Sequence, residues 1–241
     1  MAEQRGGARD AEDAGRDGRG RGGPEAAGEV ARAWDELVAT ARRTVADGLV
    51  VGTSGNVSVR VGDIVLVTPT GVPYERLEPG DAVGVDPDGR QVLGTLRPTS
   101  ELPMHLAVYR TTTARAVVHT HAVHATAVST LVAELPLVHY MAAALGGAVR
   151  VAPYATYGTA ELAENMLRAL TDRTACLLQN HGTVAHGSSL TQAYDRTAQL
   201  EWMCRLWLTA SSVPGLSPAL LTPEQVSEVA ERLRGYGQGR A

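Results

Sequence analysis

The stretch AVVHTHAVH, residues 116–124, carries two histidines, His119 and His121, directly after an apolar, β-branched run. Side chains two positions apart project from the same face of a strand, so both imidazoles would point toward one place. Two converging imidazoles are half of a divalent metal site, and zinc is the usual metal of His-rich catalytic sites. The alternative is a pair of capping or surface histidines, so the decision depends on finding further ligands elsewhere in the chain.

A third histidine, His181, follows a buried strand predicted at 175–178, and Gly182 after it would give the backbone room to turn. Three histidines with one open position are typical of a catalytic zinc, whereas structural zinc sites are closed. Glu101, at the start of a predicted helix, is the candidate fourth ligand or general base, although a carboxylate there also suits a helix N-terminus. We interpret the other histidines as packing or surface residues: His105, His124, His139 and His186.

The composition excludes several classes of function. Arg supplies all 22 residues of the Lys and Arg count, so a Schiff-base mechanism, which needs a Lys amine, is excluded. The net charge is −4 and no long basic run occurs, so neither nucleic acid nor an anionic membrane is an expected partner. No apolar run approaches the ~20 residues of a membrane helix, and no secretory signal is visible. With Cys176 and Cys204 far apart, we expect a cytoplasmic protein without disulfides.

Hydrophobic periodicity predicts an α/β protein with a single three-layer domain. Residues 1–28 lack apolar periodicity and are predicted to be a disordered tail, 29–237 to be the catalytic domain, and 238–241 to be a C-terminal tail. A hairpin is predicted at 57–67, and helical patterns precede and follow it, among them one over 126–132. The last helix is predicted to begin after Thr222 as N-cap, with Pro223 at its first position and Gln225 three residues after the cap. We therefore expect a mainly antiparallel central sheet flanked by helices.

Two loops rich in Gly and hydroxyl side chains, 52–56 and 68–71, form a second theme together with Thr99 and Ser100. Small hydroxyls, Asn and exposed backbone N–H groups can hold a phosphate monoester in a chain that has no Lys. The loop 52–56 by itself is equally what a turn before a strand looks like, so both interpretations stay open on that loop alone.

Taken together, these segments resemble the class II aldolases of the L-fuculose phosphate type, within the aldolase/epimerase/adducin fold group. The matching segments are SGNVSVR (54–60), TPTGVPYE (68–75), TSE (99–101), VVHTHAVHATAVS (117–129), HYM (139–141), APYATYG (152–158) and LLQNHG (177–182). The resemblance spans about residues 29–237. The His-x-His strand and the His-Gly pair are common to the whole group, whereas PYAT and HYM are associated with its aldolase branch.

The resemblance implies one zinc ion per subunit, held by His119, His121 and His181 with Glu101 close to it. It implies a substrate phosphate held by five residues: Asn56, Thr70, Gly71, Thr99 and Ser100. Tyr140 and Tyr236 would act on the aldehyde half, with Tyr140 reaching the active site of a neighbouring subunit in a homotetramer. Tyr157 stands where a relative has Phe, which leaves the aldehyde preference open.

The implied reaction is the reversible aldol cleavage of a ketose 1-phosphate, of the L-fuculose 1-phosphate type, to dihydroxyacetone phosphate and a short aldehyde such as L-lactaldehyde. Zinc would act as a Lewis acid, and Glu101 would transfer the proton at carbon. Alternatives of the same fold are a methylthioribulose-phosphate dehydratase and a ribulose-phosphate 4-epimerase, whose pattern has Asp where this chain has His139. The third alternative is an adducin-like interaction module, which would not need the three histidines and Glu101.

Overall fold

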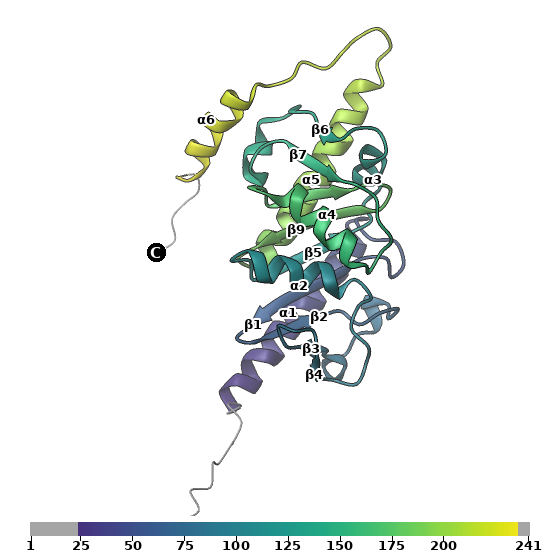
Figure 1. The fold of residues 1–241 in the computed structure, drawn as a ribbon, viewed down its shortest axis with the longest axis vertical. Coiled ribbons are helices and arrows are strands. Elements are labelled where there is room, and N and C mark those ends of the chain that lie inside the picture. Colours follow the sequence, from purple (N-terminus) through teal and green to yellow (C-terminus); the bar gives the residue numbers. More distant parts are fainter. Residues whose placement is uncertain (1–23, 236–241) are drawn as a thin grey trace, which may run out of the picture.

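Across residues 24–235, which the computed structural model describes, a nine-stranded sheet runs through the centre of the protein (Figure 1). The order is β4-β3-β2-β1-β5-β9-β8-β7-β6. Neighbouring strands pair antiparallel except β7 and β8, which are parallel, so the predicted mainly antiparallel sheet is confirmed. The strands are β1 (Asn56–Val61), β2 (Ile64–Val67), β3 (Gly84–Val85), β4 (Gln91–Leu93), β5 (Ala116–Thr120), β6 (Glu134–Leu135), β7 (Val149–Ala152), β8 (Ala175–Leu178) and β9 (Gly182–Gly187).

Helices cover both faces of this sheet and complete the three layers. The α-helices are α1 (Pro24–Ala46), α2 (Leu102–Thr111), α3 (Val123–Ser129), α4 (Ala160–Leu170), α5 (Leu190–Ser211) and α6 (Pro223–Leu233). Three short 3₁₀ helices are η1 (Tyr74–Arg76), η2 (Pro79–Asp81) and η3 (Tyr140–Leu145). A long connection leads from α5 to α6, which packs against η3 (Figure 1). None of the helices within residues 24–235 combines the length and apolar character needed to cross a membrane.

The side chains of β5 show which helices lie on which face. Val117 belongs to a buried cluster with Met104 of α2 and Met166 of α4. Val118, on the opposite face, packs in the cluster that contains Trp34 of α1 and residues of α5. Because strand side chains alternate, His119 shares the face of Val117 and points toward the α2 side of the sheet.

Strand register brings the chemically interesting residues to one end of the sheet. Asn56 at the start of β1 pairs with His119 near the end of β5. On the other side of β5, Thr120 pairs with Thr183 at the start of β9, and Leu178 at the end of β8 pairs with Gly182. The turns after β5 and β8, which carry His121 and His181, therefore lie next to each other.

The structure corrects three expectations about the elements. Helix α1 begins at Pro24, so the tail predicted for residues 1–28 is wrong for 24–28; an Ala-rich segment with Pro at its first position favours a helix there. Residues 1–23 and the C-terminal tail, 238–241, lie outside the described residues. Strands β4 and β9 do not figure in the sequence-based prediction, and helix α3 begins at Val123 and ends at Ser129 instead of spanning 126–132.

Candidate metal centre

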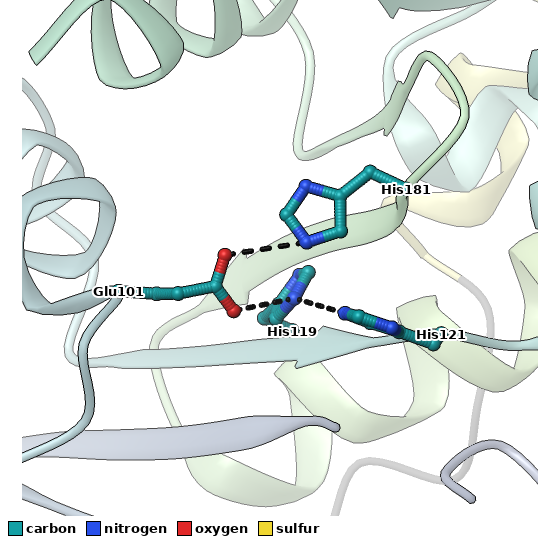
Figure 2. A group of neighbouring side chains, drawn as sticks. All are labelled: Glu101, His119, His121 and His181. Carbon is teal, nitrogen blue, oxygen red and sulfur yellow. Dashed lines mark hydrogen bonds and ion pairs between the residues drawn. The ribbon is translucent and has the colours of Figure 1, made fainter. Parts of the chain in front are cut away.

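Glu101, His119, His121 and His181 converge on one point, with their ligand atoms all within 4.8 Å of one another (Figure 2). Nε2 of His119 lies 3.0 Å from Nε2 of His121 and 2.9 Å from Oε2 of Glu101. Nε2 of His181 lies 3.2 Å from Oε1 of Glu101. The structure therefore brings together all four residues that the sequence indicates as metal ligands.

The backbone fixes the tautomer and orientation of His119. Its Nδ1 lies 2.8 Å from the carbonyl oxygen of Thr183 on β9, and the side chain is fully buried. A carbonyl oxygen only accepts hydrogen bonds, so Nδ1 carries a proton, and the neutral ring therefore has its lone pair on Nε2. That is the form in which an imidazole binds a metal ion.

The turn that carries His181 depends on two neighbouring residues. Asn180 has a φ of 56°, in the left-handed region that Asn tolerates better than most residues. A Cβ on Gly182 would lie 2.1 Å from the carbonyl oxygen of Thr120, so only glycine allows β9 to approach β5 this closely. The residue in the left-handed conformation is thus Asn180, and not Gly182 as predicted. The glycine at position 182 is needed instead for the close approach of β9 to β5.

The electrostatics of the group suit a cation. Burial alone raises the pKa of Glu101, but the charges of the neighbouring His119 and His181, with the hydrogen bond from His119, outweigh it and hold that pKa well below its usual range. Burial, with help from His119 and His181, lowers the pKa of His121 to about 3. At neutral pH the group therefore presents a carboxylate next to a neutral imidazole, the protonation states that metal ligation requires.

A buried oxygen in the cluster supports the same conclusion. Oε1 of Glu101 is buried and has no hydrogen-bond partner among the described residues, since its contact with His181 lacks hydrogen-bond geometry. Such an orphaned acceptor is costly unless a cation or donor meets it. The separations of 2.9–3.2 Å between these ligand atoms are also close to the ~3.3 Å edge of a tetrahedron built on zinc–nitrogen bonds of about 2.0–2.1 Å. The residues present therefore fit a divalent metal ion.

A cavity of about 320 Å³ opens onto this group. His121, His181 and Glu101 line it, whereas His119 lies beneath, fully buried. All five residues predicted for phosphate binding line the same cavity: Asn56, Thr70, Gly71, Thr99 and Ser100. They come from segments far apart in the sequence, and Tyr154 and Tyr157 border the cavity with exposed rings.

Asn56 differs from the other four because both ends of its side-chain amide already have partners. Its Nδ2 donates to Oε2 of Glu101 at 3.0 Å, and its Oδ1 lies 2.5 Å from Nε2 of His105. The NH₂ group has a second hydrogen, so a phosphate contact by Asn56 would use that hydrogen and leave the bond to Glu101 in place. Thr99 uses its hydroxyl oxygen to accept from the backbone N–H of Glu101 at 3.2 Å, which leaves its hydroxyl hydrogen for another acceptor.

The interpretation of His105 as a packing or surface residue misses its connection to the site. His105 is fully buried, and its Nδ1 lies 2.6 Å from Oγ of Ser58. Burial, together with the charge of His119 and against that of Glu101, lowers the pKa of His105 to about 3. One signal was available in the sequence, because His105 follows Glu101 by one helical turn and so shares its side of α2.

The two tyrosines predicted to act on the aldehyde are placed differently. Tyr140 begins η3 with its side chain 50% exposed, and it is not among the described residues that line the cavity. Its ring lies 4.4 Å from that of His139, which in turn lies 4.7 Å from the ring of Trp202. Tyr236 lies outside the described residues.

Comparisons with known proteins agree with this geometry. The family model "Class II Aldolase and Adducin N-terminal domain" matches residues 35–208. The chain is 45% identical to L-fuculose phosphate aldolase of Escherichia coli over 79% of this chain and 88% of the relative. It is 36% identical to 5-deoxy-D-ribulose 1-phosphate aldolase of Bacillus thuringiensis, over 85% and 96% respectively. A solved L-fuculose 1-phosphate aldolase superposes with a TM-score of 0.81 at 35% identity, covering 84% of this chain and 96% of that one. The chain therefore belongs to the class II aldolase and adducin family, and within that family it is an aldolase.

Proposed function

We propose that the protein catalyses the reversible aldol cleavage of L-fuculose 1-phosphate to dihydroxyacetone phosphate and L-lactaldehyde. The observation that carries this proposal is a single cavity lined by both the Glu101–histidine group and the hydroxyl-rich phosphate segments. A ketose 1-phosphate places its phosphate close to the carbonyl and hydroxyl that react, so one cavity must serve both. The relative from Bacillus thuringiensis is named for 5-deoxy-D-ribulose 1-phosphate, and the similar solved structure is named for L-fuculose 1-phosphate.

We assign the group of ligands to one zinc ion per subunit, held by His119, His121 and His181 with Glu101 beside them. Imidazole donors and an open position favour zinc over the harder cations. A zinc ion bound there supplies Lewis-acid polarisation of substrate oxygens.

Replacing one ligand tests this assignment. We expect His121→Ala to lose both bound zinc and activity, whereas His186→Gln, at the far end of the sheet, should keep both. Zinc per chain is measured by elemental analysis alongside the cleavage rate. Full activity of the wild-type protein after thorough removal of metal by a chelator would contradict the assignment.

The phosphate group is assigned to the segments 70–71 and 99–100. Backbone N–H groups and the hydroxyls of Thr70, Thr99 and Ser100 supply the donors that a lysine would supply elsewhere. Helix α2 begins just after Ser100, so the positive end of its dipole also favours an anion at this position. The two cysteines are free and buried, which agrees with the cytoplasmic location that we propose for an enzyme of phosphorylated sugars.

Glu101 is the group placed to exchange a proton with substrate carbon, since it is ionised at neutral pH and lines the cavity. Glu101→Gln keeps the size of the side chain but removes the base. We expect the variant to fold normally and to lose proton exchange between solvent and dihydroxyacetone phosphate by about 10²–10⁴-fold. The exchange is followed by NMR in deuterated water. A rate near that of the wild type would mean that Glu101 is not the base and acts only as a carboxylate at the start of a helix.

An assay of the purified protein against a panel of sugar phosphates tests the proposed reaction. The panel contains L-fuculose 1-phosphate, 5-deoxyribulose 1-phosphate, methylthioribulose 1-phosphate and ribulose 5-phosphate. We expect dihydroxyacetone phosphate to form, with the highest kcat/KM for L-fuculose 1-phosphate. An epimerised pentulose 5-phosphate or a dehydrated product, without release of dihydroxyacetone phosphate, would overturn the proposal in favour of the epimerase or the dehydratase.

A further inference from the structure

A row of buried polar side chains leads from Glu101 into the core between β1 and α2. Asn56 contacts Oε2 of Glu101 at 3.0 Å, and His105 contacts Asn56 at 2.5 Å. Ser58 contacts Nδ1 of His105 at 2.6 Å, and the hydroxyl of Tyr109 contacts that of Ser58 at 2.7 Å. Ser58 and His105 are fully buried, and Asn56 and Tyr109 are 4% and 5% exposed.

The chemistry of these groups gives the row one direction. A carboxylate only accepts, so Asn56 turns its NH₂ to Glu101 and its carbonyl oxygen to His105. That carbonyl oxygen also only accepts, so Nε2 of His105 donates and Nδ1 of the neutral ring accepts from Ser58. The Ser58 oxygen can then accept from Tyr109. Every hydrogen bond in the row therefore points toward Glu101.

Packing alone does not account for such a row. Apolar side chains of similar size would fill the same space without the desolvation cost of four buried polar groups. The row makes one contact that apolar side chains cannot make, the N–H that it delivers to Oε2 of Glu101. Each inner member restricts the one outside it, so the Asn56 amide cannot rotate without breaking its bond to His105.

We propose that Asn56, held in place by His105, Ser58 and Tyr109, positions the Glu101 carboxylate. The amide fixes Oε2 and thereby leaves Oε1, beside His181, as the oxygen free to meet the metal ion or the substrate proton. This inference rests on the proposed metal site and on the proposed role of Glu101. It gives Asn56 a positioning role in addition to the phosphate contact predicted for it.

Zinc affinity of the metal-free protein, measured by competition with a chromogenic chelator, tests the inference. His105→Leu removes the donor to Asn56, and we expect it to weaken zinc binding about 10-fold or more, as loss of groups behind metal ligands typically does. His105→Gln offers an amide N–H to Asn56 and should retain most of the affinity. In a Glu101→Gln background His105→Leu should cause no further loss, because the group that it positions is already gone.

Two smaller changes keep the test decisive if His105→Leu does not fold. Ser58→Ala and Tyr109→Phe each delete one hydroxyl of the row, and we expect weaker losses of zinc affinity in the same direction. The matched control is Tyr194→Phe, which deletes a hydroxyl bonded to Asp47 outside the site and should leave zinc affinity unchanged. Ser58→Ala and Tyr109→Phe should show a lower kcat, with KM for the sugar phosphate little changed. The reason is that Ser58 and Tyr109 act through the Glu101 carboxylate and lie in neither of the segments 70–71 and 99–100.

Two results would overturn the inference, because each would mean that the row only stabilises the core. One is wild-type zinc affinity in the folded variants of the row. The other is an equal loss of zinc affinity from His105→Leu in the wild-type and the Glu101→Gln backgrounds. A wild-type protein that binds no zinc would end the metal assignment and the inference together. A protein that shows the expected zinc pattern but cleaves no ketose phosphate would refute the proposed function and leave this inference standing.

Discussion

At the scale of single residues, Glu101 lies between two kinds of partner. On one side His119 and His181 supply positive charge, with nitrogen atoms 2.9 and 3.2 Å from the carboxylate oxygens. On the other side the amide of Asn56 supplies a neutral donor at 3.0 Å. The histidines favour the ionised carboxylate and the amide limits its rotation, so charge and orientation are set by different groups.

The buried His105 predicts how stability depends on pH. Burial chiefly lowers its pKa from 6.5 to about 3, so the ring is neutral in the folded protein where it would be charged in the unfolded chain. Its contribution to stability is complete above pH 6.5 and is lost as the pH falls toward 3. Within that window one such group changes the free energy of unfolding by about 1.4 kcal/mol per pH unit.

We therefore expect metal-free His105→Gln to lose free energy of unfolding less steeply than the wild type as the pH falls below 6.5. Urea unfolding at a series of pH values measures both slopes. Tyr194→Phe is the control, because burial raises the pKa of Tyr194 to about 12, outside the window, and its slope should match that of the wild type. Equal slopes for His105→Gln and the wild type would mean that His105 is charged in the folded state.

The residues of the site differ in how far the sequence predicts them. His119 in β5 and His121 just after it are predictable, because a spacing of two at the end of a strand places both side chains on one side. The contact between His105 and Ser58 is not predictable, since a buried Ser–His contact between a strand and a helix leaves no periodic pattern. The bond from Asn56 to Glu101 depends on the same packing, and a single sequence does not contain it.

At the scale of elements, helix α3 is held at its start by a carboxylate from α5. Glu201 accepts hydrogen bonds from the backbone N–H groups of His124 and Ala125, at 3.0 and 2.7 Å. The N-cap residue is Ala122, whose methyl group cannot accept such bonds. Because α3 begins two residues after His121, Glu201 also anchors the turn that carries this predicted ligand.

Glu201→Ala should lower the free energy of unfolding by about 1–3 kcal/mol, because it leaves two helix N–H groups without their acceptor. It should also weaken zinc binding through His121. The matched control is Glu228→Ala on α6, which removes an exposed carboxylate ion-paired with Arg232 and should change stability by less than about 1 kcal/mol. Chemical unfolding and chelator competition measure the two effects, and equal values for both variants would contradict the anchoring role.

The element boundaries that the sequence fails to predict have physical causes. The cap of α3 lies on α5, far along the chain, so a local window sees only Ala122 and places the helix start too late. Strand β9 reads GTVAHG and is covered on both faces, so it lacks the alternation of a half-exposed strand. By contrast, the capping box of Thr222 and Gln225 is local, and α6 begins where it indicates.

At the scale of the whole molecule, we propose a homotetramer whose active sites are shared between chains. The support is an exposed aromatic group made of His139, Tyr140 and Trp202, in which Tyr140 and Trp202 are 50% and 46% exposed. Aromatic side chains of this kind are enriched at interfaces. Tyr140 does not line the cavity of its own chain within residues 24–235, as expected if it serves a neighbour. The sequence of one chain predicts the fold class, but its hydrophobic periodicity does not indicate which residues would reach the site of a partner chain.

Complementation tests the shared site. We expect Glu101→Gln and Tyr140→Phe, each nearly inactive alone, to regain activity when co-expressed, because some mixed sites combine an intact Glu101 with an intact Tyr140. Cleavage by the purified mixed oligomers is the measurement. Glu101→Gln co-expressed with His121→Ala is the control and should stay inactive, since both residues belong to the same chain's site. If the first pair regained no activity, Tyr140 would act in the active site of its own chain.

The close approach at Gly182 also determines which mutations this protein could survive. A Cβ there would lie 2.1 Å from the carbonyl of Thr120, between the turns that carry His121 and His181. Any side chain would push those turns apart. In a saturation library selected for catalysis, codons for glycine alone should persist at position 182. At position 180, where Asn adopts a φ of 56°, glycine codons should persist beside those for asparagine.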